Sequence, residues 1–128
     1  MLAQVSIEFI TLVMLLFIIF SFVICYNLEY FRDINERKIF YEAQIVAEDI
    51  AKEIDIAARI GDGYTRSFYL QSKILGNIDY EIIYAPYTVR VRWNDKYVEA
   101  KTSVKEIAGE IKKGKNVIRN IGGSVYVN

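Results

Sequence analysis

The sequence contains no histidine, one cysteine and one proline among its 128 residues. Without histidine the chain lacks the commonest metal ligand and the usual general base near neutral pH. This absence excludes Ser-His-Asp triads, Cys-His pairs and zinc sites that contain histidine. A single cysteine cannot form a disulfide within the chain. We therefore expect no catalytic residues, no metal site and no cofactor, and a protein that is not an enzyme.

Charge is almost absent from the N-terminal part of the chain. Residues 1–28 carry no Lys or Arg and a single acid, Glu8. Residues 29–62 carry nine acids and five bases, whereas residues 63–128 carry six acids and eleven bases. The whole chain balances at 16 of each sign, which gives no reason to expect a nucleic-acid partner.

An uncharged run of 18 residues, Phe9–Tyr26, is interrupted only by Thr11 and Ser21. As a helix it would span ~27 Å, close to the ~30 Å hydrocarbon core of a bilayer. Thirteen of the 18 residues are Leu, Ile, Phe or Val. Their insertion into a membrane is favoured by about 4 to 8 kcal/mol. We predict a transmembrane or assembly segment at about residues 9–26.

A second helical pattern follows the apolar run, and neither Pro nor Gly interrupts residues 1–60. Apolar residues recur at spacings of three and four, as on one face of a helix: Ile39, Ala43, Val46, Ile50, Ile54 and Ala57. We predict one long helix over residues 4–60, ended by Gly61 in a left-handed conformation. Four acids spread around this helix and are expected to be solvated rather than to hold a cation: Glu48, Asp49, Glu53 and Asp55.

Residues 61–128 have the composition of short strands separated by turns. Aromatic and β-branched residues gather in seven segments: Tyr64–Gln71, Ile78–Tyr84, Tyr87–Trp93, Lys96–Thr102, Val104–Ile107, Asn116–Arg119 and Ser124–Val127. A small sheet that faces the apolar stripe of a helix forms a core that neither could form alone. We predict an α+β fold, in which a long N-terminal helix, membrane-spanning and then amphipathic, precedes a small antiparallel β-sheet head.

Two hairpin registers can be derived from the turns. A two-residue turn at Asn94-Asp95 pairs Val91 with Val98, Val89 with Ala100 and Arg90 with Glu99. A turn at Ala85-Pro86 pairs Ile82 with Val89, Tyr80 with Val91 and Glu81 with Arg90. Both registers bury the same residues of the middle strand and pair opposite charges outside, which favours a three-stranded meander.

A short motif stands immediately before the apolar run. Gln4, Ser6, Glu8 and Leu12 spell Q-x-S-x-E-x-x-x-L. Here the chain resembles archaeal type IV pilin-like proteins with a class III signal peptide, and residues 107–109, 115–120 and 125–127 also resemble the closing strands of such subunits. The resemblance implies that a prepilin peptidase cuts between Ala3 and Gln4. It would remove the leader, residues 1–3, and leave the apolar helix on the mature subunit.

The resemblance also implies a function and partners. It identifies the chain with a structural subunit, a major or minor pilin, of a type IV pilus-like filament with a role at the cell surface such as adhesion. The implied partners are copies of the chain or other pilin subunits, a prepilin peptidase, a membrane platform protein with its assembly ATPase, and membrane lipid before assembly. The subunit would be a single-pass membrane protein first and part of an extracellular filament after processing.

Glu8 is the residue whose chemistry matters most in this interpretation. A carboxylate beside an apolar helix is costly unless it is neutralised or paired. In the pilin interpretation its partner is the new α-amino group of Gln4, on the same subunit or on a neighbour. Otherwise, Glu8 lies in the headgroup layer at the start of a membrane anchor. The alternative function is then a single-pass membrane protein that never polymerises and carries a small extracytoplasmic β binding domain.

Overall fold

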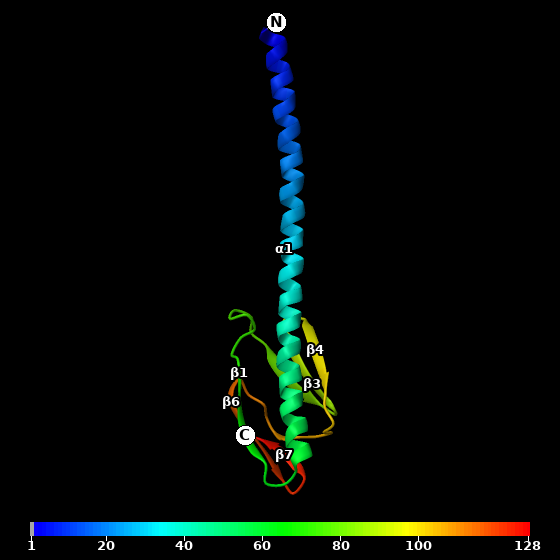
Figure 1. The fold of residues 1–128 in the computed structure, drawn as a ribbon, viewed down its shortest axis with the longest axis vertical. Coiled ribbons are helices and arrows are strands. Elements are labelled where there is room, and N and C mark those ends of the chain that lie inside the picture. Colours follow the sequence, from blue (N-terminus) through cyan, green and yellow to red (C-terminus); the bar gives the residue numbers. More distant parts are fainter. Residues whose placement is uncertain (1) are drawn as a thin grey trace. The chain divides into compact units, whose positions relative to one another are not determined.

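The computed structural model describes residues 2–128 and contains one helix followed by seven strands in that part of the chain (Figure 1). The elements are α1 (Leu2–Ile60), β1 (Thr65–Leu70), β2 (Glu81–Ala85), β3 (Thr88–Trp93), β4 (Lys96–Lys101), β5 (Ala108–Gly109), β6 (Gly114–Ile121) and β7 (Ser124–Val127). The chain divides into two compact units, one that ends at Arg37 and one that comprises Lys38–Asn128. Helix α1 contributes residues to both units. The fold class is therefore α+β, as predicted.

The C-terminal part of α1 supplies one side of the core. Its buried residues follow the predicted stripe: Ala43, Val46, Ala47, Ile50, Ala51, Ile54 and Ala57. The alanines leave room for the sheets to approach the helix axis closely. The helix ends as predicted, because Gly61 has a φ of 88° and its N–H bonds to the carbonyl of Ala57 at 3.3 Å.

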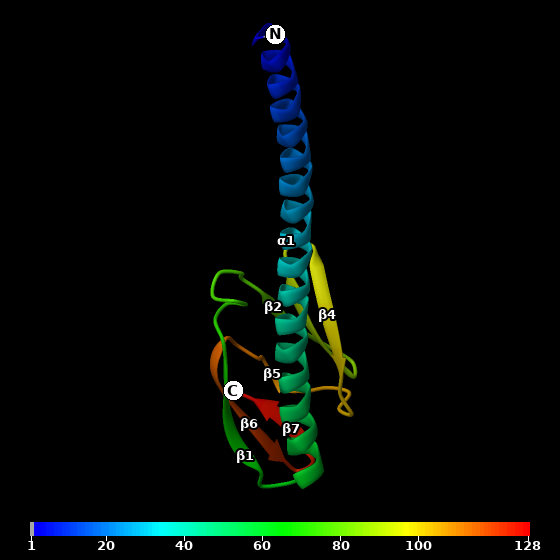
Figure 2. The same ribbon diagram turned by 45° about the horizontal axis from the view of Figure 1, so that its top comes forward.

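The strands form two sheets rather than one. Strands β2, β3 and β4 form an antiparallel sheet in that order, and the second sheet has the order β1-β6-β7-β5, with a parallel pair between β5 and β7. Both sheets pack against the buried stripe of α1, and in the view of Figure 1 strands β1 and β6 lie to the left of the helix and β3 and β4 to its right; Figure 2 shows the same elements turned by 45°. Their inner side chains complete the core, among them Val89, Val91, Ile118 and Val125.

One of the two derived registers is confirmed and the other is wrong. Strands β3 and β4 pair in the predicted register. In the β2–β3 pair, Ile82 lies opposite Val91 instead of Val89, because the loop is formed by Pro86 and Tyr87. Proline suits the first central position of a turn, and the predicted loop would have placed it second. Tyr87 takes the left-handed conformation that this turn requires, with a φ of 59°. The two-residue shift leaves the same faces buried.

Two strand boundaries also differ from the prediction. The expected strand at residues 104–107 is absent, and the short strand β5 begins only at Ala108. The phenol of Tyr84 donates a hydrogen bond to the Val104 carbonyl, so the backbone there bonds to a side chain instead of a strand. Strand β2 begins at Glu81, because the preceding Ile78 pairs with Ile74 in an isolated bridge.

Two acids of α1 are not solvated as expected. The Oδ1 atom of Asp55 accepts hydrogen bonds from Thr102 Oγ1 at 2.6 Å and from the N–H and Oγ of Ser103, each at 2.8 Å. Burial alone would raise the pKa of Asp55, but these hydrogen bonds outweigh it and lower the pKa below the ordinary 3.8. Glu53, whose side chain is 16% exposed, pairs with Arg66 at 3.5 Å. The prediction of a solvated face was therefore wrong for Asp55 and Glu53.

Candidate functional site

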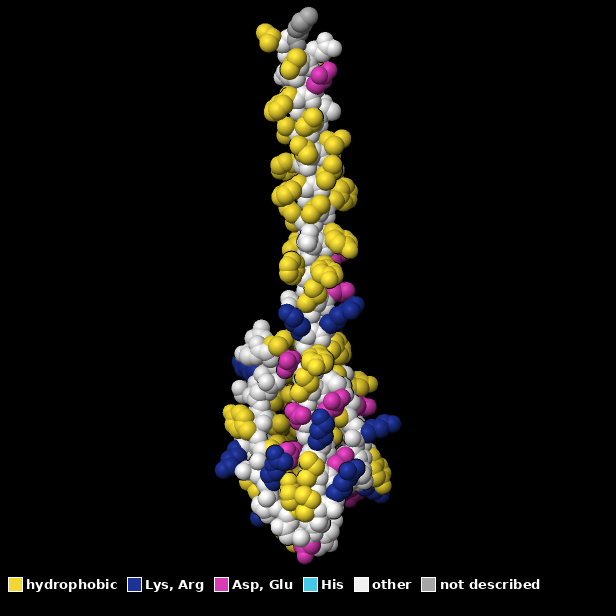
Figure 3. Space-filling model, in the orientation of Figure 1, with side chains coloured by type: hydrophobic (Ala, Val, Ile, Leu, Met, Phe, Trp, Pro, Cys, Tyr) yellow, Lys and Arg dark blue, Asp and Glu magenta, His cyan; other side chains and the backbone are white. Residues whose placement is uncertain are grey.

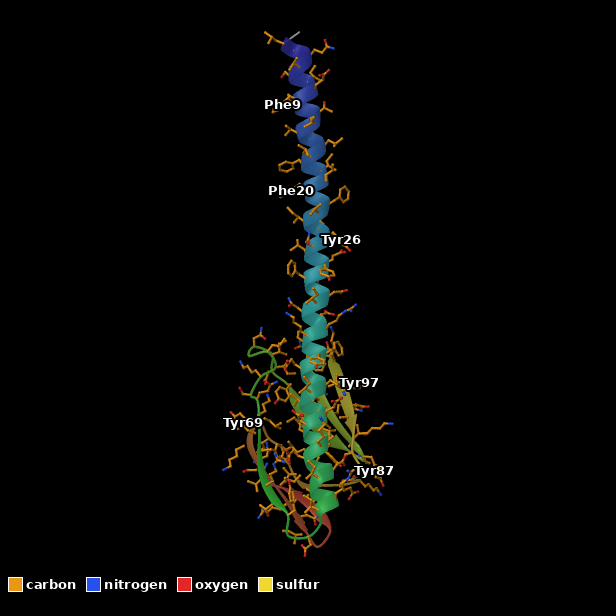
Figure 4. The ribbon with its side chains drawn as sticks, viewed as in Figure 1. Phe9, Phe20, Tyr26, Tyr69, Tyr87 and Tyr97 are labelled. Carbon is orange, nitrogen blue, oxygen red and sulfur yellow. The ribbon has the colours of Figure 1, made fainter. Side chains whose placement is uncertain are left out.

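The apolar run of α1, residues 9–26, carries no charge and is exposed throughout. All side chains over residues 2–33 are exposed, and hydrophobic side chains cover most of this part of the helix on the face that Figure 3 shows. Phe9 and Phe20, which are 67% and 63% exposed, project away from the helix in Figure 4. Monomeric soluble proteins rarely expose contiguous apolar patches larger than a few hundred Å². Exposure of this extent is typical of a segment that lipid or another protein covers.

The same segment has the length and hydropathy of a membrane span. An 18-residue window of α1 has a mean hydropathy of 2.8, and none of it is buried within the protein. The absence of burial distinguishes this helix from the core helix of a soluble protein. Its length and composition suit a transmembrane helix, and a signal segment near an N-terminus has the same properties.

Polar side chains in and just after the apolar run bond to the helix backbone. Thr11 Oγ1 donates to the carbonyl of Ile7 and Ser21 Oγ to that of Phe17, both at 2.8 Å. The Nδ2 atom of Asn27 donates to the carbonyl of Val23 at 2.7 Å in the same way. Each donor is thereby satisfied without water, which allows these residues to enter a water-free environment. Thr11 and Ser21 therefore do not interrupt the apolar run as the sequence suggests, because helical Ser and Thr commonly bond to the carbonyl four residues earlier.

The N-terminal motif lies entirely on α1, and all of its residues are exposed. Because residues four apart are neighbours on a helix, Gln4, Glu8 and Leu12 form a row along one face. Ser6 falls outside that row. The bond between Ala3 and Gln4 lies in the first turn, where backbone N–H groups lack intrahelical partners and the helix opens most easily. The helix thus places the expected new N-terminus one turn from Glu8.

Glu8 has no hydrogen-bond or ion-pair partner within residues 2–128. The first Lys or Arg of the chain is Arg32, 24 residues further along, which corresponds to ~36 Å of helix. The described part of the chain therefore provides no charge that compensates Glu8. Any charge that compensates this carboxylate therefore lies outside residues 2–128.

The buried tyrosines of the second unit are structural. Burial and the nearby charge of Asp79 raise the pKa of Tyr80 to about 12, and burial raises the pKa of Tyr84 as well. Both phenols therefore stay protonated near neutral pH and donate hydrogen bonds to backbone carbonyls, Tyr80 to that of Gln71. Within residues 2–128, no group of three or more Cys, Asp or Glu side chains is placed to hold a metal ion.

An open groove of about 700 Å³ lies on the second unit between β2 and the segment 105–111. Four isoleucines contribute to its lining: Ile82, Ile83, Ile107 and Ile111. Charged residues, including Lys105 and Glu110, also line it. The groove thus combines apolar and charged side chains on the surface of the head.

The order of the described elements shows the type of architecture. A long apolar helix comes first, and a small β head built on its C-terminal part follows. The architecture is pilin-like. The chain matches no protein-family model, no curated protein and no solved structure. The pilin-like interpretation therefore rests on the helix, the head and the N-terminal motif alone.

Proposed function

We propose that this chain is a structural subunit, a major or minor pilin, of an archaeal type IV pilus-like surface filament. The observation that carries the proposal is the exposure of an apolar helix surface on all sides over residues 2–26. A surface of this kind suits lipid in one state and neighbouring copies of the same helix in another. The solvated head would then form the outside of the filament.

Assembly requires a change in what covers the helix. Before assembly, lipid covers the apolar run. A prepilin peptidase cuts between Ala3 and Gln4, and a membrane platform protein with its ATPase transfers the subunit into the filament. Lipid tails are as apolar as leucine, so exchanging lipid for another helix brings little hydrophobic gain. Cohesion then depends on close packing of side chains and on specific polar contacts.

Glu8 provides the specific polar contact in this proposal. Cleavage frees the α-amino group of Gln4, and the two charges pair between neighbouring subunits. A pair of opposite charges in a dry helix bundle fixes the axial position at which two helices meet, because any other register leaves a charge unpaired. The absence of a partner for Glu8 within residues 2–128 is consistent with an intersubunit role.

The substitution Glu8→Ala tests this role in cells that express the full chain. It removes the carboxylate without adding a charge, so insertion into the membrane should be unchanged. Incorporation into filaments should fall by about tenfold or more, because an unpaired α-amino group is left in an apolar environment. Immunoblots of membrane and sheared-filament fractions measure the two quantities.

Asp49→Ala is the matched control, since Asp49 is also an exposed acid of α1 but lies in the second unit. This control should assemble like the unmodified chain. Normal assembly of the Glu8→Ala chain would refute the charge-pairing role. Equal loss in both variants would indicate a general effect of removing an acid.

A second candidate function is a single-pass membrane protein that does not polymerise. The groove between β2 and residues 105–111 favours it, because a partner of the head would have a surface on which to bind. The two candidates differ in where the unmodified chain is found. A filament subunit appears in the sheared fraction, whereas a permanent anchor remains entirely with the membrane.

A further inference from the structure

The outer faces of the two sheets differ in how their charges are compensated. On the outer face of the β2-β3-β4 sheet, Arg90 pairs with Glu99 and Arg92 with Glu81, each at 2.5 Å. The guanidinium of Arg90 also lies 4.8 Å from the ring centre of Tyr97. These two arginines and two acids compensate one another, and of the outward residues of β4 only Lys101 adds a charge without an ion pair in the described part of the chain.

The outer face of the β1-β6-β7-β5 sheet lacks such compensation. Alternate residues of β6 are buried, which directs the others outward. Its outward residues and their cross-strand neighbours form a surface that we call the basic face: Tyr69, Lys115, Val117, Arg119, Ile121 and Tyr126. The outward positions of β1, β6 and β7 include no Asp or Glu. Within residues 2–128, neither Lys115 nor Arg119 has an ion-pair partner.

Aromatic and apolar side chains accompany these two cations. Tyr69 lies opposite Lys115 and is 75% exposed, and it projects from β1 in Figure 4. Tyr126 of β7 lies opposite Arg119 of β6, and Ile121, also on β6, is 55% exposed. Tyrosine, arginine and exposed aliphatic residues are characteristic of protein interfaces. The basic face therefore suits an acidic partner surface that also carries aromatic groups.

The first unit of the same chain carries such a surface. Tyr26, Glu29, Tyr30 and Asp33 recur at spacings of three and four, so they lie on one face of α1. All four are exposed, and together with Arg32 and Glu36 they line an open groove of about 420 Å³, in which three acids stand against one base. We call these four residues the acidic stripe. It follows directly on the apolar run, of which Tyr26 is the last residue.

We propose that the basic face of one subunit docks on the acidic stripe of a second copy of this chain. The inference rests on the proposed filament function, which brings many copies together. One chain carries both complementary surfaces, so the contact is head-to-tail and can repeat from copy to copy without closing. Lys115 and Arg119 would meet the carboxylates of Glu29 and Asp33, and the tyrosine rings would add cation–π contacts.

Disulfide cross-linking tests the contact directly, because Cys25 is the only cysteine of the chain. In a Cys25→Ser background, Arg119→Cys is combined with Asp33→Cys, and sheared filaments are oxidised. A ladder of cross-linked multimers is expected, since the two positions would lie within disulfide reach across the contact. The control combines Lys101→Cys with Asp33→Cys, because Lys101 is an exposed residue of the other sheet. A ladder in the control but not in the test pair would overturn the proposal.

Charge reversal provides an independent test that also controls for misfolding. Combining Lys115→Glu with Arg119→Glu should reduce filament incorporation by about tenfold, because like charges would face each other. Adding Glu29→Lys and Asp33→Lys to the same chain should restore it, which a misfolded head would not allow. Lys101→Glu should have no effect.

The outcomes separate this inference from the function on which it rests. Absence of the unmodified chain from filaments would refute both. Filaments that contain the unmodified chain, together with normal assembly of the Lys115→Glu, Arg119→Glu chain, would refute the docking contact alone. The docking contact would also be refuted if the Lys115→Glu, Arg119→Glu chain assembled normally but no longer bound an acidic polymer such as polyglutamate. In that case the basic face would bind an external ligand instead of a second copy.

Discussion

The contact between Asn120 and the end of α1 leads to a quantitative prediction. Asn120 is 2% exposed, its Nδ2 donates to the carbonyl of Ala57 at 2.9 Å, and its Oδ1 accepts from the N–H of Gly123 at 3.0 Å. The Ala57 carbonyl belongs to the last turn of the helix and also accepts a longer hydrogen bond, at 3.3 Å, from the N–H of Gly61. One side chain therefore joins the end of α1 to the β6–β7 turn.

The substitution Asn120→Leu keeps the approximate size of the side chain but removes both hydrogen bonds. The Ala57 carbonyl keeps the N–H of Gly61, and Gly123 is exposed, so neither backbone group is left without a partner in the interior. Each lost hydrogen bond then contributes about 0.5–1.5 kcal/mol, and the expected loss in the free energy of unfolding is about 1–3 kcal/mol, against the 5–15 kcal/mol typical of a domain. The control Asn77→Leu should have little effect, since Asn77 is exposed and its side chain has no hydrogen bond in the described residues.

Asn120→Asp gives a pH-dependent version of the same test. An ionised Asp can accept from Gly123 but cannot donate to Ala57, whereas a protonated Asp can do both. Burial would raise the folded-state pKa of this carboxyl above its unfolded value. Its contribution to stability would then be present at low pH and lost as the pH rises through the folded-state pKa. The stability difference from the unmodified chain should therefore narrow on acidification.

The assay is urea unfolding of the full chain in detergent micelles, followed by the fluorescence of Trp93. This residue is the only tryptophan and is 4% exposed, so its emission reports on the unfolding of the head. A decrease of less than about 1 kcal/mol for Asn120→Leu would refute the reasoning, because it would mean that the two side-chain hydrogen bonds contribute little to stability.

Two further predictions use the same assay. Asp55→Asn should lower stability by about 1 kcal/mol at neutral pH, because charged hydrogen bonds become neutral ones; a larger effect is not expected of a partly exposed side chain. The hydrogen bonds lower the pKa of Asp55 despite its burial, so its contribution to stability is lost as the pH falls through that lowered value. The free energies of unfolding of the variant and of the unmodified chain should therefore converge in acid. Parallel pH profiles of the two would contradict this prediction. Gly109→Ala should lower the free energy of unfolding more than Gly76→Ala. Both glycines have a positive φ, but only at Gly109 would the new Cβ overlap a backbone atom, the carbonyl oxygen of Val127. Equal losses of stability in the two variants would contradict this prediction.

Local patterns in the sequence were sufficient to predict the helix and one hairpin. The spacing of small and branched apolar residues predicted the buried stripe of α1, and Gly61 marked its end. Both features depend on residues a few positions apart, which a linear pattern can represent. The β3–β4 register followed from a turn whose two residues were identified correctly.

Contacts between distant residues were not predictable in this way. Asp55 resembles any other exposed helix acid until the turn after β4 brings Thr102 and Ser103 to it. Asn120 stands one residue beyond the predicted strand at 116–119, and its role depends on the end of a helix 63 positions earlier. The β2–β3 register failed on a single local choice, the position of Pro86 within its turn. The compensation of charge on each sheet face likewise required the actual strand order.

The central claim is that the apolar helix leaves the membrane for a filament after its leader has been removed. Intact-mass and N-terminal peptide mass spectrometry of the sheared surface fraction tests this claim most directly. The account predicts that the chain in this fraction begins at Gln4. Recovery of the chain only from membranes, with Met1, Leu2 and Ala3 still attached, would contradict it.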